Sequence, residues 1–168
     1  MLERLKAGGK CEPKNFHIIV VDNGSTDGSV ELLKEKYPEV ESVFLSENTG
    51  FAPAVNRGLE HTKTSYALLL NNDILVEADF VQKMEQAMES HKNCFSVSAK
   101  MLQMHQPELL DGAGDLYCAL GWAFALGKGK TESDHYTKPA KIFSSCGGAV
   151  MYVLYRCGSK RYEASICT

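Results

Sequence analysis

The chain has 168 residues, of which 44% are hydrophobic, and its formal net charge is −3. This length and composition suit a single globular domain over residues 1–168 with a sizeable core. The small negative charge excludes a strongly basic face, so we do not expect nucleic acid as a partner. No apolar run reaches the roughly 18 residues of a transmembrane helix, and the start lacks the apolar core of a signal peptide. We therefore expect a cytoplasmic chain, or a peripheral one at the inner face of a membrane, with no transmembrane segment.

The first clear element is a strand. Four consecutive β-branched residues, Ile18-Ile19-Val20-Val21, predict a strand that is covered on both faces, as in a parallel sheet. The strand stops at Asp22, and a loop of small polar residues leads to a helix predicted over residues 28–37, with Asp27 as its N-cap. Asp22 is therefore expected at the carboxyl end of a strand, where open α/β sheets bind their ligands.

Strands and helices then alternate. We expect strands over residues 41–45, 66–70 and 93–98, and helices over residues 50–61 and about 76–91, whose apolar residues recur at helical spacing. This alternation predicts an α/β fold with a mostly parallel sheet flanked by helices. The strand over residues 66–70 runs into Asn71-Asn72-Asp73. Two acids, each at the end of a strand, suggest one site.

From residue 100 onward the character of the chain changes. Glycines interrupt residues 111–130, which predicts an irregular excursion rather than a helix, and residues 131–139 are expected to form a loop. A strand over residues 141–154 returns to the sheet, and Gly147-Gly148 inside it indicate a close approach by a ligand or another backbone. The six cysteines lack the spacing of a metal site, which favours reduced structural thiols.

Four motifs carry a family resemblance. They are VVDNGSTDGS at residues 20–29, ENTGFA at residues 47–52 followed by NRG at 56–58, LLNND at residues 69–73, and CGGA at residues 146–149. In this order and spacing they resemble the family-2 glycosyltransferases of GT-A fold, especially the bacterial rhamnosyltransferase-like branch, over about residues 1–152. The resemblance implies a GT-A-like, Rossmann-like domain of cell-wall or polysaccharide biosynthesis. Such a domain transfers a sugar from a UDP- or dTDP-linked donor to a saccharide or lipid-linked acceptor, with inversion.

The resemblance also implies roles for single residues. The carboxylate of Asp22 only accepts hydrogen bonds, so it can receive the ring N3–H of uracil or thymine. Asn71-Asn72-Asp73 takes the place of the family's Asp-x-Asp motif, in which Asp73 alone offers an anionic metal ligand. We expect Mg²⁺ or Mn²⁺ to enter with the nucleoside diphosphate. The residues implied to bind the donor are Asp22, Asn23, Gly24, Ser25, Asn48, Gly50, Phe51, Asn56, Arg57, Asn71, Asn72 and Asp73. The structural alternatives are local capping by Asp22 or Asp73, and a solvated helix position for Arg57.

The chain departs from the family at both ends. Family members open with a strand before a helix like residues 2–7, and this chain begins partway through that helix, so we expect the usual first strand to be missing. The downstream Glu-Asp pair that supplies the family's general base is also missing, because Glu163 is followed by Ala164. No catalytic residue is assigned. The sequence is thus expected to be a fragment truncated at both ends, whose exposed sheet edge favours a homo-oligomer. The alternative function is a non-catalytic nucleotide-sugar-binding or self-associating remnant.

Overall fold

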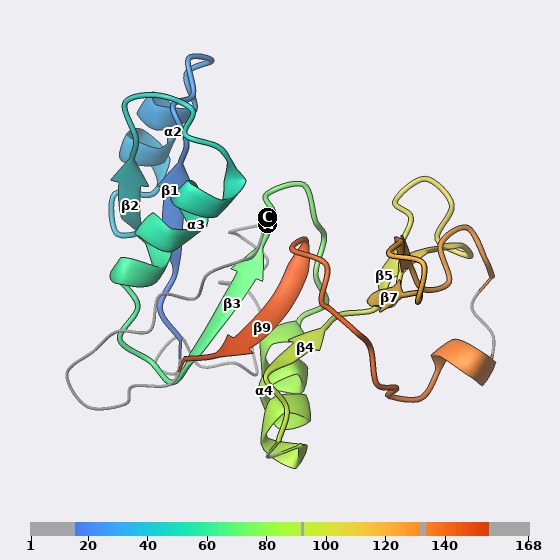
Figure 1. Ribbon diagram of the computed structural model, residues 1–168. Coiled ribbons are helices and arrows are strands. Elements are labelled where there is room, and N and C mark those ends of the chain that lie inside the picture. Colours follow the sequence, from blue (N-terminus) through green and yellow to red (C-terminus); the bar gives the residue numbers. More distant parts are fainter. Residues whose placement is uncertain (1–15, 92, 132–133, 155–168) are drawn as a thin grey trace. The chain divides into compact units, whose positions relative to one another are not determined.

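The computed structural model describes residues 16–91, 93–131 and 134–154 (Figure 1). These residues fall into two compact units. The described part of the first unit is residues 16–67 with Leu154, and that of the second unit lies within residues 68–153. Strands and helices alternate over the first hundred residues, which confirms the expected α/β class.

The first unit is built on two parallel strands. Strand β1 (Ile19–Asp22) pairs in parallel with β2 (Glu41–Phe44), and Asp22 stands opposite Phe44 at the carboxyl end of the pair. Helix α2 (Ser29–Lys36) connects the two strands, and α3 (Phe51–Glu60) follows β2. All four elements lie within one or two residues of their predicted bounds. Both loops that follow the strands therefore leave from the same edge of the pair.

Helix α2 begins differently from the prediction. Its N-cap is Gly28, which has a φ of 87° and a left-handed conformation, and not Asp27. The Asp27 carboxylate still serves the helix start from one position earlier, because its Oδ1 accepts hydrogen bonds from Ser29 N at 3.1 Å and Ser29 Oγ at 2.6 Å. These bonds hold the pKa of Asp27 below its usual value. Glycine takes the N-cap because the chain must turn through positive φ there.

Helix α3 packs closely against β1. Ala54 on this helix is buried, and a Cβ added to Gly58 would lie 2.9 Å from Cγ2 of Val21. A larger residue at position 58 would push α3 away from the strand. The small residues of α3 therefore fix the distance between the helix and the strand that ends at Asp22.

The second unit has a three-stranded sheet with the order β3-β9-β4. Strand β3 (Tyr66–Leu70) starts in the first unit and ends in the second, and β9 (Ala149–Val153) lies between it and β4 (Ser96–Ser98), as Figure 1 shows. Helix α4 (Phe80–Ser90) contacts β4 and β9. The buried core of this unit includes Val76, Met84, Met88, Leu110, Ala149, Val150 and Met151.

The described sheets are mixed. Strands β1 and β2 are parallel, as expected, whereas β9 runs antiparallel to β4, with Val97 opposite Met151. Alternation predicts parallel pairing only for strands that a helical crossover joins. Strand β9 instead follows the long segment after residue 100, in which the described residues form no α-helix, so its direction is independent of that rule.

The segment after residue 100 is an excursion of short antiparallel strands. Strand β5 (Met101–Leu102) pairs with β6 (Leu110–Gly112), and β7 (Asp115–Tyr117) pairs with β8 (Ala123–Ala125). A 3₁₀ helix, η1 (Asp134–Tyr136), lies where only a loop was predicted. The absence of an α-helix in this segment is confirmed for the residues that the structure describes.

The predicted strand over residues 141–154 is too long. Strand β9 occupies only its second part, and the first part pairs with β7 instead. Asp115 N donates to Ser144 O at 2.9 Å, and Phe143 N donates to Asp115 O at 2.9 Å. The chain pairs first with β7 and only then enters the β3-β9-β4 sheet as strand β9. Gly147 and Gly148 therefore lie between two segments that pair with different strands.

Candidate functional site

Asp22 ends β1 with its side chain turned into the protein. The residue is 8% exposed and is the only buried charged residue in the part of the chain that the structure describes. Its Oδ1 accepts a hydrogen bond from Ser25 N at 2.9 Å, and its backbone oxygen accepts one from Leu45 N at 2.9 Å. A carboxylate has about four acceptor positions, so the one hydrogen bond that its side chain accepts from the described residues leaves acceptor capacity for a ligand N–H.

The loop after β1 is tied to the loop after β2 through Asn23. The Nδ2 of Asn23 donates to Asn48 Oδ1 at 3.0 Å and to Gly50 O at 3.1 Å. Its Oδ1 accepts from Thr49 N at 2.9 Å and from Thr49 Oγ1 at 3.1 Å. Asn48 Oδ1 also accepts from Gly50 N at 3.0 Å. Two side-chain amides thus join two loops that are 25 residues apart in sequence.

Gly24 allows the two loops to touch. It has a φ of 78°, and a Cβ at this position would lie 2.5 Å from the backbone carbon of Glu47 and 2.7 Å from Asn48 N. No side chain fits at these distances, and positive φ is costly for residues other than glycine. The predicted residues Asp22, Asn23, Gly24 and Asn48 therefore form one compact loop cluster in the first unit.

The remaining predicted residues of the first unit differ in their surroundings. Phe51 is the first residue of α3 and is half exposed, and Asn56 lies further along the same helix, partly buried. The Nη1 of Arg57 lies 3.2 Å from Glu60 Oε2, and both side chains are exposed. This pairing is typical of a solvated helix position, which is the alternative that the sequence left open for Arg57.

Asn71, Asn72 and Asp73 follow β3 in the second unit, and all three are exposed. Asn71 N donates to Gly148 O at 3.0 Å, so the turn is anchored at the point where β9 begins. A Cβ on Gly148 would lie 3.4 Å from Met101 Sδ and 3.6 Å from Ile74 Cδ1. The glycine pair predicted a close approach by a ligand or by another backbone, and the backbone of Asn71 does approach Gly148; a ligand at this position stays a prediction.

The donor set at this turn suits a metal that arrives with its ligand. Among the described residues no three His, Cys, Asp or Glu side chains gather in a way that could hold a metal ion. Asp73 has no hydrogen bond or ion pair within that part of the chain, so its carboxylate is accessible. One carboxylate beside two amide side chains fits a hard divalent cation that keeps several other oxygen ligands. Asp22 and Asp73 belong to different units, and their combination in one site stays a prediction.

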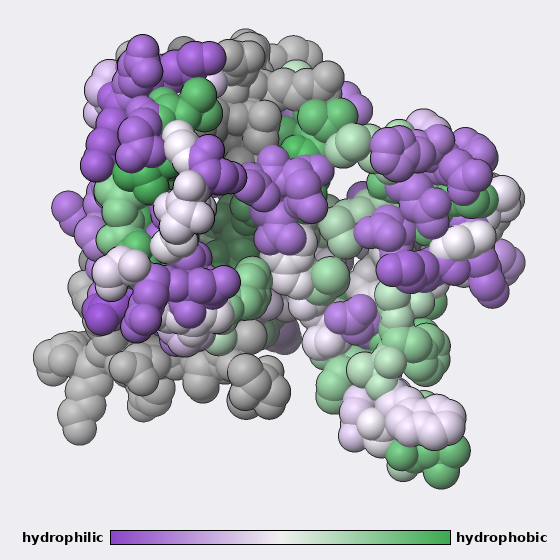
Figure 2. Space-filling model, turned by 90° about the horizontal axis from the view of Figure 1, so that it is seen from above, coloured by the Kyte–Doolittle hydropathy of each residue, from purple (hydrophilic) through white to green (hydrophobic). Residues whose placement is uncertain are grey.

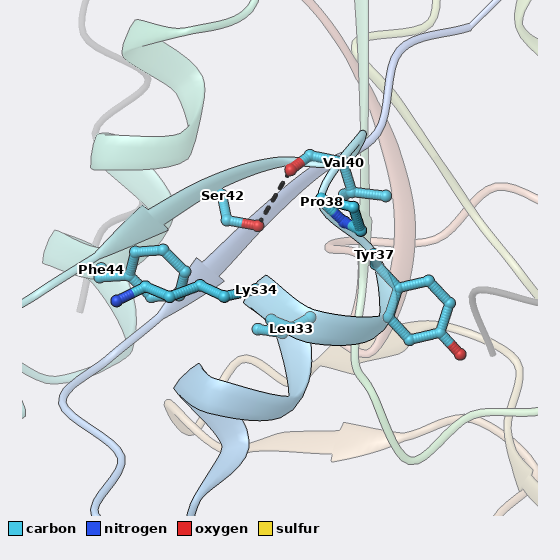
Figure 3. A pocket seen from close by; sticks show the side chains of 7 residues that line it. All are labelled: Leu33, Lys34, Tyr37, Pro38, Val40, Ser42 and Phe44. Atoms are coloured by element: carbon cyan, nitrogen blue, oxygen red, sulfur yellow. Dashed lines mark hydrogen bonds between the residues drawn. The ribbon is translucent and has the colours of Figure 1, made fainter.

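A surface groove of about 310 Å³ lies elsewhere in the first unit, between α2 and β2 (Figure 3). The Ser42 hydroxyl on its floor donates to Val40 O at 3.1 Å, and Lys34 Nζ lies 4.9 Å from the centre of the Phe44 ring. None of the residues implied to bind the donor lines this groove. Its lining consists of Leu33, Lys34, Tyr37, Pro38, Val40, Ser42 and Phe44.

A comparison with known protein families identifies the family to which this chain belongs. The family described as "Glycosyl transferase family 2" matches residues 1–145. The chain belongs to glycosyl transferase family 2. As a member of this family it has the GT-A α/β fold, and the loop cluster and the Asn71–Asp73 turn both fall inside the matched region.

Individual family-2 relatives are similar over part of their length. The chain is 32% identical over 100 residues to the putative teichuronic acid biosynthesis glycosyltransferase TuaG of Bacillus subtilis, covering 58% of this chain and 40% of the relative. It is 36% identical over 74 residues to glycosyltransferase GlyA of Streptococcus pneumoniae, covering 42% of this chain and 10% of the relative. A third relative is the undecaprenyl-phosphate 4-deoxy-4-formamido-L-arabinose transferase of Edwardsiella ictaluri, 28% identical over 93 residues, with coverage of 53% and 29%. The matches thus span less than half the length of these relatives.

Some sequence expectations lie outside the described residues, including the helix over residues 2–7 and the position of Glu163. The three cysteines that are described, Cys94, Cys118 and Cys146, are free thiols, as expected. No described helix is long and apolar enough to cross a membrane.

The sequence analysis did not single out Thr49, whose backbone N–H and hydroxyl both donate hydrogen bonds to Asn23. Its place inside the ENTGFA motif was the available signal.

Proposed function

We propose that this family-2 domain binds a UDP- or dTDP-linked sugar and transfers the sugar to a saccharide or lipid-linked acceptor with inversion. The motifs also favour the bacterial rhamnosyltransferase-like branch of the family. The relative named for teichuronic acid biosynthesis supports a role in cell-wall or polysaccharide assembly.

The observation that carries the proposal is the loop cluster around Asp22. A carboxylate is held at a strand end by Ser25 N–H, and the surrounding loops are fixed by the Asn23–Asn48 hydrogen bond. Such a site is already ordered before a ligand arrives, which lowers the entropic cost of binding. We assign Asp22 to the N3–H of uracil or thymine, because an ionised carboxylate only accepts hydrogen bonds.

The diphosphate is assigned to the turn after β3. Asp73, with the side-chain oxygens of Asn71 and Asn72 as further ligands, would hold Mg²⁺ or Mn²⁺ together with the phosphate oxygens of the donor. A metal bound there supplies positive charge for the departing nucleoside diphosphate. Inversion means that an acceptor hydroxyl attacks the anomeric carbon on the face opposite the leaving group. The new C–O bond forms as the bond to the phosphate oxygen breaks, and the hydroxyl proton passes to a general base.

Calorimetry with UDP and dTDP, each with and without Mn²⁺, tests the binding proposal. We expect tighter binding with the metal, and Asp73→Asn should reduce the affinity in Mn²⁺ to the metal-free level. Glu77→Gln is the matched control, since it removes an exposed carboxylate four residues away. Asp22→Ala should weaken binding by roughly 1–3 kcal/mol whether or not metal is present, because it leaves the base N–H unpaired. Asp27→Asn controls for the loss of one charge in the same loop.

Transfer is tested separately with a panel of sugar nucleotides and acceptors. Release of nucleoside diphosphate that depends on the acceptor, with an inverted product, would support the full proposal. Metal-independent nucleotide binding would remove Asp73 from the metal role. Binding without transfer by the native, full-length protein would favour the non-catalytic alternative.

A further inference from the structure

Strand β2 forms one edge of the strand pair in the first unit. Leu45 N donates to Asp22 O at 2.9 Å, and the hydrogen bonds of a parallel ladder repeat every two residues. Val43 therefore directs its backbone groups toward β1, whereas Ser42 and Phe44 direct theirs away from it. Within the described residues no strand pairs with this outer side of β2. The backbone N–H and C=O groups of Ser42 and Phe44 are thus available to another strand.

The groove between α2 and β2 lies over this outer side. Its lining comes from α2, the turn after α2 and β2, with no residue from β1 (Figure 3). The small side chain of Ser42 forms its floor, while the ring of Phe44 is 38% exposed. Figure 2 shows small apolar areas (green) among hydrophilic side chains (purple) on the side of the molecule that carries β2 in Figure 1. The same strand therefore has a shallow apolar groove and an exposed aromatic ring.

A second copy of β2 in antiparallel orientation matches the hydrogen-bonding pattern of this edge. In an antiparallel pair, opposite residues that exchange two hydrogen bonds alternate with opposite residues that exchange none. The register centred on Val43 places Ser42 of each copy opposite Phe44 of the other. Both outward-facing residues of the strand then exchange their hydrogen bonds with the second copy, and the two copies are related by a two-fold axis.

This register also fills the groove. Residues that lie opposite each other in a sheet project from the same face, so Phe44 of the second copy projects beside Ser42 on the side of α2. The small serine leaves room for the ring, and Leu33 and Val40 supply apolar walls. Each copy would thus bury the ring that the other exposes. This match of a small residue with a large one on the same strand favours a second copy of the chain over an unrelated strand.

The edge of β2 lacks the features that usually prevent strands from pairing. Such edges carry charged side chains, prolines or bulges. Residues 42–44 are uncharged and contain no proline, and the β1–β2 register is regular. Glu41 is charged, but its carboxylate is hydrogen-bonded to His17 and His61.

We propose that two copies of this chain associate through their β2 strands and form one continuous four-stranded sheet with the order β1-β2-β2-β1. The homo-oligomer that the sequence predicts through an exposed sheet edge is thereby assigned to the outer edge of β2. The proposal is independent of the nucleotide site, because it uses none of the residues assigned to the donor or to the metal.

Sedimentation equilibrium of the full chain tests the association. We expect a monomer–dimer equilibrium with a dissociation constant on the order of 10 µM, because a short strand pair with one ring on each side forms a small interface. Phe44→Ser should weaken the dimer by roughly tenfold to a hundredfold, since each dimer loses two buried rings. Met104→Ser is the matched control, because it removes another exposed apolar side chain, in the second unit, and should leave the equilibrium unchanged.

Ser42→Pro tests the backbone contribution separately. It removes an N–H that points away from β1, and proline is tolerated at such positions of an edge strand. We expect a weaker dimer and a folded monomer. Circular dichroism and urea unfolding check the fold of each variant.

Cross-linking tests the register. Val43→Cys places two cysteines opposite each other with Cα atoms about 4.5 Å apart, which is within the range of a disulfide. Mild oxidation should join the two copies through the introduced cysteine, as peptide mapping by mass spectrometry can show. Ser42→Cys should not give this bridge, because the two introduced cysteines are two residues out of register.

Three results would overturn the proposal. One is a chain that stays monomeric at concentrations about a hundredfold above the expected dissociation constant. Another is a dimer that folded Phe44→Ser and Ser42→Pro variants form as tightly as the native chain. The third is cross-linking through Ser42→Cys and not through Val43→Cys, which would exclude the register that fills the groove.

Discussion

Asn23 and Asn48 link the loops at the carboxyl ends of β1 and β2, through a hydrogen bond of 3.0 Å from Nδ2 of Asn23 to Oδ1 of Asn48. The same two side chains also bond to the backbone of Thr49 and Gly50. The position of the Asp22 carboxylate relative to the second loop therefore depends on two neutral amides.

Asn23→Ala should destabilise the fold by about 1 kcal/mol, because the partners of its amide lose hydrogen bonds at a partly solvated site. We expect a larger effect on nucleotide affinity than on stability, since the loop around Asp22 becomes mobile. Urea unfolding and calorimetry measure the two effects. The control is Thr26→Ala, which changes an exposed residue of the same loop. Equal nucleotide affinity in the two variants would contradict this role for Asn23.

Gly24→Ala and Gly28→Ala form a matched pair. Both glycines have positive φ, but only a Cβ at position 24 meets backbone atoms, whereas nothing lies within 4 Å of one at position 28. Gly28→Ala should cost about 1 kcal/mol for strain alone. Gly24→Ala should cost roughly 1–3 kcal/mol more, because the loops must separate. Equal unfolding free energies would show that the two loops do not depend on this contact.

Gly58→Ala tests the packing of α3 on β1. Alanine favours a helix over glycine by about 1 kcal/mol, but its Cβ would lie 2.9 Å from Val21 Cγ2. We expect a net loss of about 1–2 kcal/mol in the native background, since overpacking outweighs propensity. In a Val21→Ala background the same change should become neutral or stabilising. A double-mutant cycle measured by denaturant unfolding gives the coupling, and a value near zero would contradict the contact.

Glu41 lies between two histidines, with Oε2 2.5 Å from His17 Nε2 and Oε1 2.6 Å from His61 Nδ1. The hydrogen bond from His17, followed by that from His61, holds the pKa of Glu41 below its usual value. A lowered folded-state pKa stabilises the fold at pH values above the unfolded pKa, and this contribution is lost as the pH falls through the folded pKa. The difference in stability between the native chain and Glu41→Gln should therefore shrink below about pH 4. Unfolding between pH 7 and 3, with Glu35→Gln as control, measures it; a difference independent of pH would contradict the assignment.

The sequence predicted the first unit well, because local signals there agree with the fold. The β-branched run before Asp22 and the apolar spacing in α3 each point to one structure. The N-cap of α2 was misassigned because Asp27 has the residue type of a cap, while the turn into the helix requires the positive φ of Gly28. Residue type alone did not show which of two adjacent positions carries that conformation.

Prediction was weaker where pairing is non-local. Helix α4 starts at Phe80, about four residues later than predicted, because Val76 is buried in the loop before the helix and not in the helix. Residues 141–148 were predicted as the first part of one long strand, but Ser144 pairs with Asp115 on β7. The hydrogen bond from Asn71 N to Gly148 O joins residues that no short sequence window contains. Such pairings depend on tertiary contacts that propensity does not encode.

The position of β9 between β3 and β4 affects how the chain folds while the ribosome synthesises it. Strands β3 and β4 emerge from the ribosome early, yet each pairs with a strand at residues 149–153 and not with the other. The sheet of the second unit cannot form until more than fifty further residues have been translated, so its contact order is high and its folding is expected to be slow. During that interval both strands expose unpaired backbone edges. Strands β1 and β2, which a single short helix joins, can pair beforehand. Nascent-chain arrest at successive lengths should therefore give protease protection in two stages, the second only after residue 153 has left the exit tunnel.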